Sequence, residues 1–344
     1  MSSARGIPKL VNYEIVEKIG EGGMGAVYRA TDKLGQIRAV KVIHPELAHD
    51  TGLRERFTNE GKTLAAIGRH PNITALWGLL EENNYLFIVM DYVEGEDVER
   101  KLKRNGALSV AEALPLFSQI LSAIAYAHQQ GIIHRDVKPS NILIESSGQI
   151  RVMDFGIARI KGGPRSTKVG VPGTPEYMAP ELFAEQTQGA NELTDIYALG
   201  VTLYEMLTAA LPFESSATDT NAAYVAIAQK HLKGKPRRPS ELVPGLDKEV
   251  ERVIMKAIAK EPKDRFQTVP EFSQAIDQQV GRLDISAAGQ AQPGGAAARG
   301  TMVETPLPGT PVVGGGESAF PLWAVAAAWA VAAGIGFLLG RQLP

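Results

Sequence analysis

The chain of 344 residues is long enough for two average domains or for one two-lobed enzyme with an appendage. Its 36 basic and 38 acidic residues nearly cancel, so no global field favours nucleic acid, and none is expected as a partner. Because cysteine is absent, disulfides, thiolate metal sites and cysteine nucleophiles are excluded. Residues 1–20 contain no apolar stretch typical of a secretory signal, so we expect the bulk of the chain to stay in the cytoplasm.

The predicted elements change character along the chain. Over about residues 12–92, short β-branched runs broken by turns predict a small, mostly β unit with one long helix at 51–68. Over about residues 93–281, apolar residues recur at helical spacing and predict a larger helical unit. Residues 282–320 are rich in Gly, Pro, Ala and Thr, which predicts a flexible linker. The expected fold class is α+β.

The segment 321–340 carries no charged residue and is long enough to cross the hydrocarbon core of a bilayer, ~30 Å thick. A hairpin or a buried core helix is the alternative, and the high alanine content makes the insertion energy marginal. Small residues recur every four positions, and Gly336 with Gly340 forms G-x-x-x-G, a pattern that pairs helices in lipid. Composition alone could also produce this stripe. We expect a single-pass tail anchor, with a homodimer if the helices pair.

Three glycines in the first β runs, Gly20, Gly22 and Gly25, match G-x-G-x-x-G. This pattern is weak alone, because dinucleotide-binding folds and ordinary hairpins also produce it. A dinucleotide fingerprint runs from a strand into a helix, whereas here the sequence AVYRAT continues as a strand. We therefore expect a hairpin whose backbone amides approach phosphates.

A lysine, Lys41, lies inside the apolar run RAVKVI. A buried ammonium is costly unless it is paired, and Glu60 in a helix-like run could supply the partner. An edge-strand lysine that reaches solvent is the alternative reading of the same run.

Polar residues are concentrated between two apolar runs at 132–144, namely His134, Arg135, Asp136, Lys138 and Asn141. The triplet Asp154, Phe155 and Gly156 follows, and GTPEYMAPE then occupies 173–181. No ordinary structural pattern explains a base, a cation and two types of metal ligand in this order.

These motifs resemble the eukaryotic-type protein kinase superfamily over residues 12–281, and EGGMGAVYRATD and SNILI look like the bacterial membrane-anchored serine/threonine kinases. The resemblance implies a bilobal kinase domain, with an N-lobe at about 12–92 and a C-lobe at about 93–281. It implies transfer of the γ-phosphate of ATP to serine or threonine hydroxyls of proteins, with Mg²⁺ as the metal and Mn²⁺ a possible substitute. The kinase domain would lie in the cytoplasm, anchored to the cell membrane.

The resemblance also implies roles for individual residues. Asp136 would be the catalytic base, and Lys138 would stabilise charge at the γ-phosphate. Lys41, held by Glu60, would contact the α- and β-phosphates. The metal ligands would be Asn141 and Asp154. The implied nucleotide-binding residues are Ile19, Gly20, Glu21, Gly22, Gly23, Met24, Gly25, Val27, Ala39, Lys41, Asp91, Val93 and Leu143.

The loop before GTPEY carries candidate phosphorylation sites. Arg135 beside the catalytic aspartate is typical of kinases whose activation loop is ordered by a phosphate. Ser166 and Thr167 lie in the middle of this loop, in a basic and glycine-rich stretch, and we predict autophosphorylation there. Thr174 is a weaker candidate, because its hydroxyl is expected to pack against Asp136 and Lys138. Lys138 together with Thr174 favours serine or threonine over tyrosine as the acceptor.

Supporting positions resemble structural features of the same family. Asp195 resembles the helix residue that anchors the catalytic loop, and Glu181 with Arg265 resembles a buried ion pair. The positions that match an apolar stack between the lobes are Leu64, Leu76, His134 and Phe155.

Three rival functions are consistent with parts of this pattern. A nucleotide-binding pseudokinase scaffold is disfavoured because every catalytic position is filled. A small-molecule phosphotransferase should lack GTPEYMAPE. A receptor kinase with an extracellular sensor is disfavoured because four residues follow the predicted span. The basic stretch 233–239 is interpreted as a solvated loop.

Overall fold

The computed structural model describes residues 10–22, 25–43, 67–82, 85–155, 174–184, 189–217 and 219–290, without the side chains of 220 and 283–290. Several predictions fall outside this part of the chain: Gly23, Met24, Glu60, Leu64, Ser166, Thr167, most of the helix expected at 51–68, and the segments 291–320 and 321–340.

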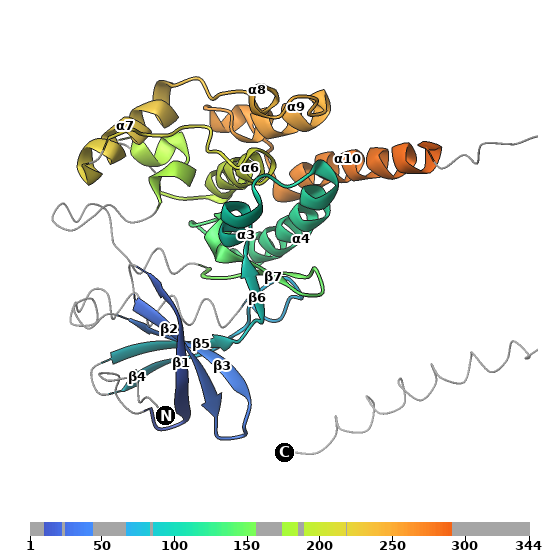
Figure 1. The fold of residues 1–344 in the computed structure, drawn as a ribbon. Coiled ribbons are helices and arrows are strands. Elements are labelled where there is room, and N and C mark those ends of the chain that lie inside the picture. The colour runs from blue at the N-terminus through green and yellow to red at the C-terminus, as the bar shows by residue number, and fades with distance from the viewer. Residues whose placement is uncertain are drawn as a thin grey trace, which may run out of the picture. The chain divides into compact units, whose positions relative to one another are not determined.

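The N-terminal lobe is a five-stranded antiparallel sheet in the order β1-β2-β3-β5-β4 (Figure 1). Its strands are β1 (Tyr13–Gly22), β2 (Gly25–Asp32), β3 (Ile37–Ile43), β4 (Leu76–Glu82) and β5 (Tyr85–Asp91). Side chains alternate between its two faces. Val40, Val42, Phe87 and Val89 pack into a small core on one face. The other face, which carries Ala39, Ile43, Ile88 and Met90, joins the core of the C-terminal lobe.

The register of β4 on β5 shifts at one point. Leu76 pairs with Met90 and Gly78 pairs with Val89, so Trp77 is the extra residue of a β-bulge. A bulge turns a side chain away from its regular direction. Leu76 therefore keeps its place on the buried face, while the indole of Trp77 is directed to the outer surface, where it is 47% exposed.

The C-terminal lobe is mostly helical. A three-stranded sheet, β6 (Gly95–Asp97), β7 (Ile142–Glu145) and β8 (Ile150–Val152), lies where the lobes meet, in the order β6-β7-β8. The α-helices are α3 (Val98–Asn105), α4 (Val110–Gln129), α6 (Glu192–Thr208), α7 (Thr220–Lys233), α8 (Pro239–Leu242), α9 (Lys248–Ala257) and α10 (Val269–Gln290). Short 3₁₀ turns are η1 (Pro139–Asn141), η2 (Pro175–Tyr177), η3 (Pro180–Phe183) and η4 (Pro262–Asp264).

Helix α4 begins at a capping box, in which Ser109 and Glu112 satisfy each other's backbone N–H groups. It is the one helix in the described part of the chain that is long and apolar enough to cross a membrane. However, α4 packs against α10, α6 and β8, and eight of its residues are buried. Its apolar character is therefore that of a core helix.

Helix α6 is buried on nearly all sides and forms the centre of the C-terminal lobe. It approaches α9 closely at Gly200, where an added Cβ would lie 2.7 Å from the Cβ of Ala257. Only glycine fits this contact without a shift of either helix. Helix α6 also carries Asp195, which accepts hydrogen bonds from the backbone N–H groups of His134 and Arg135, so this packing helps to fix the loop before β7.

Candidate active site

A cleft of about 480 Å³ lies between the N-terminal sheet and the β6–β8 region. Ten of the thirteen residues predicted to bind nucleotide line it: Ile19, Gly20, Glu21, Gly25, Val27, Ala39, Lys41, Asp91, Val93 and Leu143. The predicted catalytic and metal-binding residues Asp136, Lys138, Asn141 and Asp154 line the same cleft. Gly22 lies in β1 but does not line it, and Gly23 and Met24 lie outside the described residues.

The wall formed by β1 and β2 depends on Gly25. A Cβ added at this position would lie 1.8 Å from the backbone oxygen of Val42 in β3. No side chain fits there, so glycine is what allows the start of β2 to lie against β3. The hairpin reading of the glycine-rich motif agrees with this arrangement, because β1 and β2 pair as antiparallel strands.

The loop before β7 brings an acid, a cation and an amide together. Lys138 Nζ donates to Asp136 Oδ1 at 3.0 Å and to Thr174 Oγ1 at 2.7 Å. Asn141 Nδ2 donates to the backbone oxygen of Asp136 at 2.7 Å and to its Oδ2 at 3.1 Å. Both carboxylate oxygens of Asp136 are therefore held in place, in a side chain that keeps 15% exposure to the cleft.

This loop is anchored to α6 through Asp195, as the resemblance predicts. The buried Asp195 carboxylate accepts from the backbone N–H of His134 and of Arg135, both at 2.8 Å, and contacts His128 Nε2 at 2.8 Å. Arg135 has a φ of 69°, an uncommon conformation for a residue other than glycine. The charge-assisted hydrogen bonds to Asp195 help to hold this strained backbone in place.

His134 joins the loop to the segment before Asp154. Its Nε2 lies 2.9 Å from the backbone oxygen of Met153, while Nδ1 accepts from the Asp136 N–H at 3.2 Å. Complete burial lowers the pKa of His134, so the ring is neutral, with its proton on Nε2. This histidine is a packed structural residue, in agreement with its predicted place in the apolar stack between the lobes.

Lys41 on β3 forms an ion pair with Asp154, with Nζ 2.6 Å from Oδ2. The sequence predicted Glu60 as the partner of Lys41, and Glu60 lies outside the described residues. The alternative of an edge-strand lysine is wrong, because β3 is an interior strand and the Lys41 side chain is 11% exposed. Asp154 has a φ of 59°, so its backbone also adopts the left-handed conformation.

Asn141 and Asp154 have the chemistry of a site for a hard divalent cation. The Asn141 amide nitrogen is used on Asp136, so its amide oxygen is the atom available to a metal. Together with the Asp154 carboxylate this gives two oxygen ligands in the cleft. Mg²⁺ is commonly held by one or two such ligands and by substrate phosphates. The described residues contain no cluster of three or more His, Asp or Glu side chains that could hold a metal without substrate.

Residues 13–279 match the family model described as the protein kinase domain. The chain belongs to the protein kinase family. It is 39% identical over 268 residues to serine/threonine-protein kinase PrkC of Bacillus subtilis, covering 77% of this chain and 40% of that protein. It is 38% identical over 290 residues to serine/threonine-protein kinase pkn3 of Myxococcus xanthus, covering 79% and 51%. The chain thus spans about two fifths to half of the length of these curated relatives.

Solved structures agree with the bilobal kinase fold that the sequence predicted. The kinase domain of Mycobacterium tuberculosis PknI is 31% identical and superimposes with a TM-score of 0.63, over 81% of this chain and 100% of that one. The mostly β N-lobe and the helical C-lobe are therefore confirmed as a protein kinase fold.

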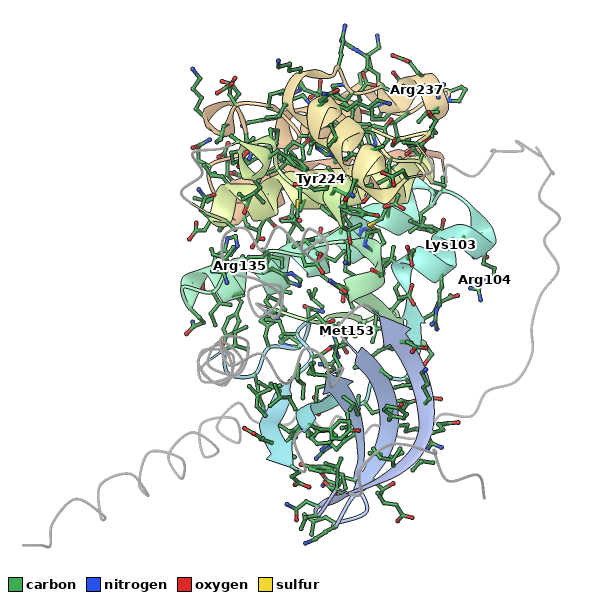
Figure 2. The ribbon with its side chains drawn as sticks, turned by 90° about the vertical axis from the view of Figure 1, so that its left-hand side faces the viewer. Lys103, Arg104, Arg135, Met153, Tyr224 and Arg237 are labelled. Atoms are coloured by element: carbon green, nitrogen blue, oxygen red, sulfur yellow. The ribbon has the colours of Figure 1, made fainter. Side chains whose placement is uncertain are left out.

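Several residues of the kinase cleft were not predicted from the sequence: Tyr92, Gly95, Asp97, Arg100, Ser140 and Met153. Met153 directly precedes the DFG triplet and lies at the level where the two lobes meet (Figure 2). Asp97 caps α3 and pairs with Arg100 at 3.1 Å. An N-capping pattern predicts where a helix begins, but it contains no information on which cleft the cap faces.

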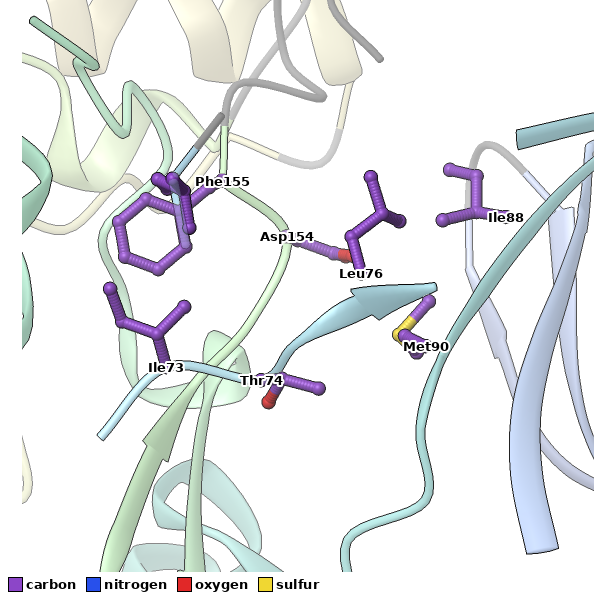
Figure 3. A pocket seen from close by; sticks show the side chains of 8 residues that line it. Ile73, Thr74, Leu76, Ile88, Met90, Asp154 and Phe155 are labelled. Carbon is purple, nitrogen blue, oxygen red and sulfur yellow. The ribbon is translucent and has the colours of Figure 1, made fainter. Parts of the chain in front are cut away.

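A smaller cavity of about 40 Å³ lies beside Met90, between the sheet and the residues Asp154 and Phe155 (Figure 3). Its wall includes Leu76, Met90 and Phe155. The Phe155 ring packs on His134 with centroids 4.5 Å apart. Three of the four residues predicted to stack between the lobes thus lie at this junction, and the fourth, Leu64, lies outside the described residues.

Glu181 and Arg265 form the predicted ion pair, in which Arg265 is buried and Glu181 is partly buried. Nη1 and Nη2 of Arg265 donate to Oε1 and Oε2 of Glu181, each at 2.7 Å. The fully buried Arg265 also donates to the backbone oxygens of Ala259, Lys260 and Leu193. Such bonds satisfy the remaining donors of a buried charge, which a lone ion pair would leave unpaired.

The hydrogen bond from Tyr177 to Glu205 was not predicted. Tyr177 lies in GTPEY and Glu205 on α6, and the phenol donates to the carboxylate. Burial raises the pKa of Glu205 above its usual value, and burial together with this carboxylate raises the pKa of Tyr177. This hydrogen bond connects the turn η2, which follows the loop with the candidate phosphorylation sites, to the central helix α6.

Proposed function

We propose that this chain transfers the γ-phosphate of ATP to serine or threonine hydroxyls of proteins. The observation that carries the proposal is the meeting of Lys41, Asp136, Lys138, Asn141 and Asp154 at one cleft. These are a base, two cations and two metal-ligand types, the set that phosphoryl transfer requires. The names of the relatives, which are serine/threonine-protein kinases, support the choice of acceptor.

Asp136 is the proposed base. Its carboxylate accepts the proton of the substrate hydroxyl as the hydroxyl oxygen bonds to the γ-phosphorus and the bond to the β-phosphate oxygen breaks. Lys138, 3.0 Å from Asp136 and 2.7 Å from Thr174, supplies positive charge between the base and the segment expected to present the peptide. Catalysis then rests on positioning and electrostatics.

The nucleotide is proposed to bind with its adenine between Ile19, Val27 and Ala39 on one side and Leu143 on the other. Backbone groups at Asp91 and Val93 would hydrogen-bond the base, and Lys41 would contact the α- and β-phosphates. Asn141 and Asp154 would hold Mg²⁺, or Mn²⁺ in its place. The metal would neutralise charge on the phosphate oxygens.

Phosphoamino-acid analysis tests the proposal. The full chain is incubated with radiolabelled ATP, Mg²⁺ and a generic protein substrate, and the product is hydrolysed in acid. We expect labelled phosphoserine or phosphothreonine. Nucleotide binding without any transfer would support the alternative, a pseudokinase scaffold, and labelled phosphotyrosine would contradict the assigned acceptor.

We further propose regulation by autophosphorylation at Ser166 and Thr167. The bond from Lys138 to Thr174 supports Thr174 as the weaker candidate, because its hydroxyl is already used. Mass spectrometry of the active kinase should find phosphate at Ser166 or Thr167. A Ser166→Ala, Thr167→Ala double variant should lose activity, and full activity in that variant would contradict the proposal.

The remaining proposals concern organisation and rest on the sequence. A kinase domain is followed by a linker and by a tail anchor at 321–340 that holds the domain at the cytoplasmic face of the cell membrane. The linker was predicted at 282–320, but helix α10 continues to Gln290, so the linker is placed after that residue. Pairing of the Gly336 and Gly340 stripe would form a homodimer. Recovery of the full chain in the soluble fraction would contradict the anchor, and unchanged helix association in a Gly336→Ile, Gly340→Ile variant would contradict the pairing.

A further inference from the structure

An indole side chain lies on the outer surface of the N-lobe beside the start of the segment that joins the lobes. Trp77 is the bulged residue of β4, an edge strand, and its side chain is directed to the outer face of the sheet. Edge-strand bulges beside active sites often serve to re-aim a side chain. The contacts of the Trp77 side chain indicate the function of this bulge.

Trp77 holds the carboxylate of Asp91. Its Nε1 donates to Asp91 Oδ1 at 2.6 Å. The backbone N–H of Asp91 donates to the Ala75 oxygen at 3.0 Å, so β4 and the residue before Leu76 hold Asp91 at two points. Asp91 is the last residue of β5 and begins the run Asp91, Tyr92 and Val93, all of which line the cleft.

Two arginines hold the indole ring in turn. The Arg38 guanidinium carbon lies 4.1 Å from the ring centroid, and that of Arg69 lies 5.5 Å from it. Arg38 is the cross-strand partner of Asp91, and its own side chain is 11% exposed. A stacked guanidinium restrains a ring that would otherwise rotate in solvent.

We propose that Trp77 is a positioning residue for the nucleotide. By fixing the Asp91 carboxylate it fixes the orientation of the backbone at 91–93, which faces the adenine site. The inference rests on the proposed binding of ATP, and it concerns affinity only: Trp77 touches neither the phosphates nor the acceptor. Loss of the Trp77 hydrogen bond should therefore weaken nucleotide binding and leave the chemical step intact.

The test compares the full chain with its Trp77→Phe variant, which keeps an aromatic ring for the arginines and loses the N–H donor. We expect the KM for ATP, and the Kd for ADP measured by calorimetry, to rise about three- to tenfold, the range of one hydrogen bond. The kcat should stay within about twofold. Tyr85→Phe, at the far end of β5, is the matched control and should leave all three values unchanged.

A double-mutant cycle separates positioning from general loss of stability. Asp91→Ala removes the acceptor, so Asp91→Ala and Trp77→Phe together should weaken ADP binding no more than Asp91→Ala alone. Additive losses, or wild-type ADP affinity in Trp77→Phe, would overturn the inference. Failure of the unmodified chain to bind ADP would instead contradict the proposed function, so the two failures are distinguishable.

Discussion

Lys41 Nζ lies 2.6 Å from Asp154 Oδ2, and this ion pair joins the N-lobe sheet to the segment that follows β8. The two residues are 113 positions apart in the sequence. The pair brings the proposed phosphate-binding cation next to a proposed metal ligand, so the charges needed at the phosphates meet at one point.

Lys41→Met should reduce phosphate transfer by about 100-fold or more, because it removes a fixed positive charge from a site of developing negative charge. Lys33→Met is the matched control, since Lys33 is exposed in the turn between β2 and β3. Initial rates at saturating ATP measure the effect. Equal losses in the two variants would contradict a specific role for Lys41.

Arg265→Leu should destabilise the kinase domain by about 3 kcal/mol, because Glu181 would keep a partly buried charge without its partner. The control is Arg252→Leu, which removes a 72% exposed arginine that pairs with Glu249 on α9 and should cost less than about 1 kcal/mol. Urea denaturation gives both values. If the two variants lose similar amounts of unfolding free energy, the Glu181–Arg265 pair stabilises the domain no more than an exposed pair does, which would contradict this prediction.

Stability should fall in mild acid through His231. Nδ1 of this buried ring lies 2.8 Å from the Tyr197 hydroxyl, and burial followed by the Lys260 charge lowers the pKa of His231 to about 3. Between about pH 6.5 and pH 3, His231 is protonated in the unfolded chain but neutral in the folded chain. The contribution of His231 to stability is therefore fully present above about pH 6.5 and decreases as the pH falls toward 3.

Between pH 7.5 and 5.5 this single histidine should cost about 1.4 kcal/mol of unfolding free energy. His231→Phe should be less stable at pH 7.5, because the buried Tyr197 hydroxyl loses its hydrogen-bond partner, but its stability should change less between the two pH values. Denaturation of both proteins at both pH values measures the difference. An equal pH dependence in the variant would exclude His231 as the source.

Two glycine substitutions should have opposite signs. Gly200→Ala places a methyl group 2.7 Å from Ala257 across the α6–α9 contact, which should cost about 1–3 kcal/mol. Gly281→Ala adds a methyl group to exposed surface of α10, where nothing lies within 4 Å, and should stabilise by about 0.5–1 kcal/mol. Thermal melts measure both changes, and a Gly200→Ala variant that melts at or above the temperature of the unmodified chain would contradict the packing described for Gly200.

The sequence was sufficient for the fold and for most of the residues that line the cleft, because the kinase motifs restrict residue types at Lys41, Asp136, Asn141 and Asp154. It could not predict contacts that depend on the arrangement of distant elements. The Tyr177–Glu205 bond joins a 3₁₀ turn to α6, and neither residue has a local pattern that indicates the other.

The bulge at Trp77 was missed for a related reason. A strand is recognised in a sequence by the alternation of apolar and polar residues. One extra residue reverses this alternation, and a short run contains no other feature that marks the bulge. The sequence of β4, LWGLLEE, therefore does not indicate the face on which its indole lies.

Asp136→Asn gives the most direct test of the central claim, that the Asp136 carboxylate is the base of a phosphotransferase. Asparagine keeps the size of the side chain and an oxygen for Lys138, but it cannot accept the hydroxyl proton. The variant should bind ADP with near wild-type affinity and should transfer phosphate to a generic protein at a rate lower by about 100-fold or more. Transfer at the wild-type rate would contradict the account.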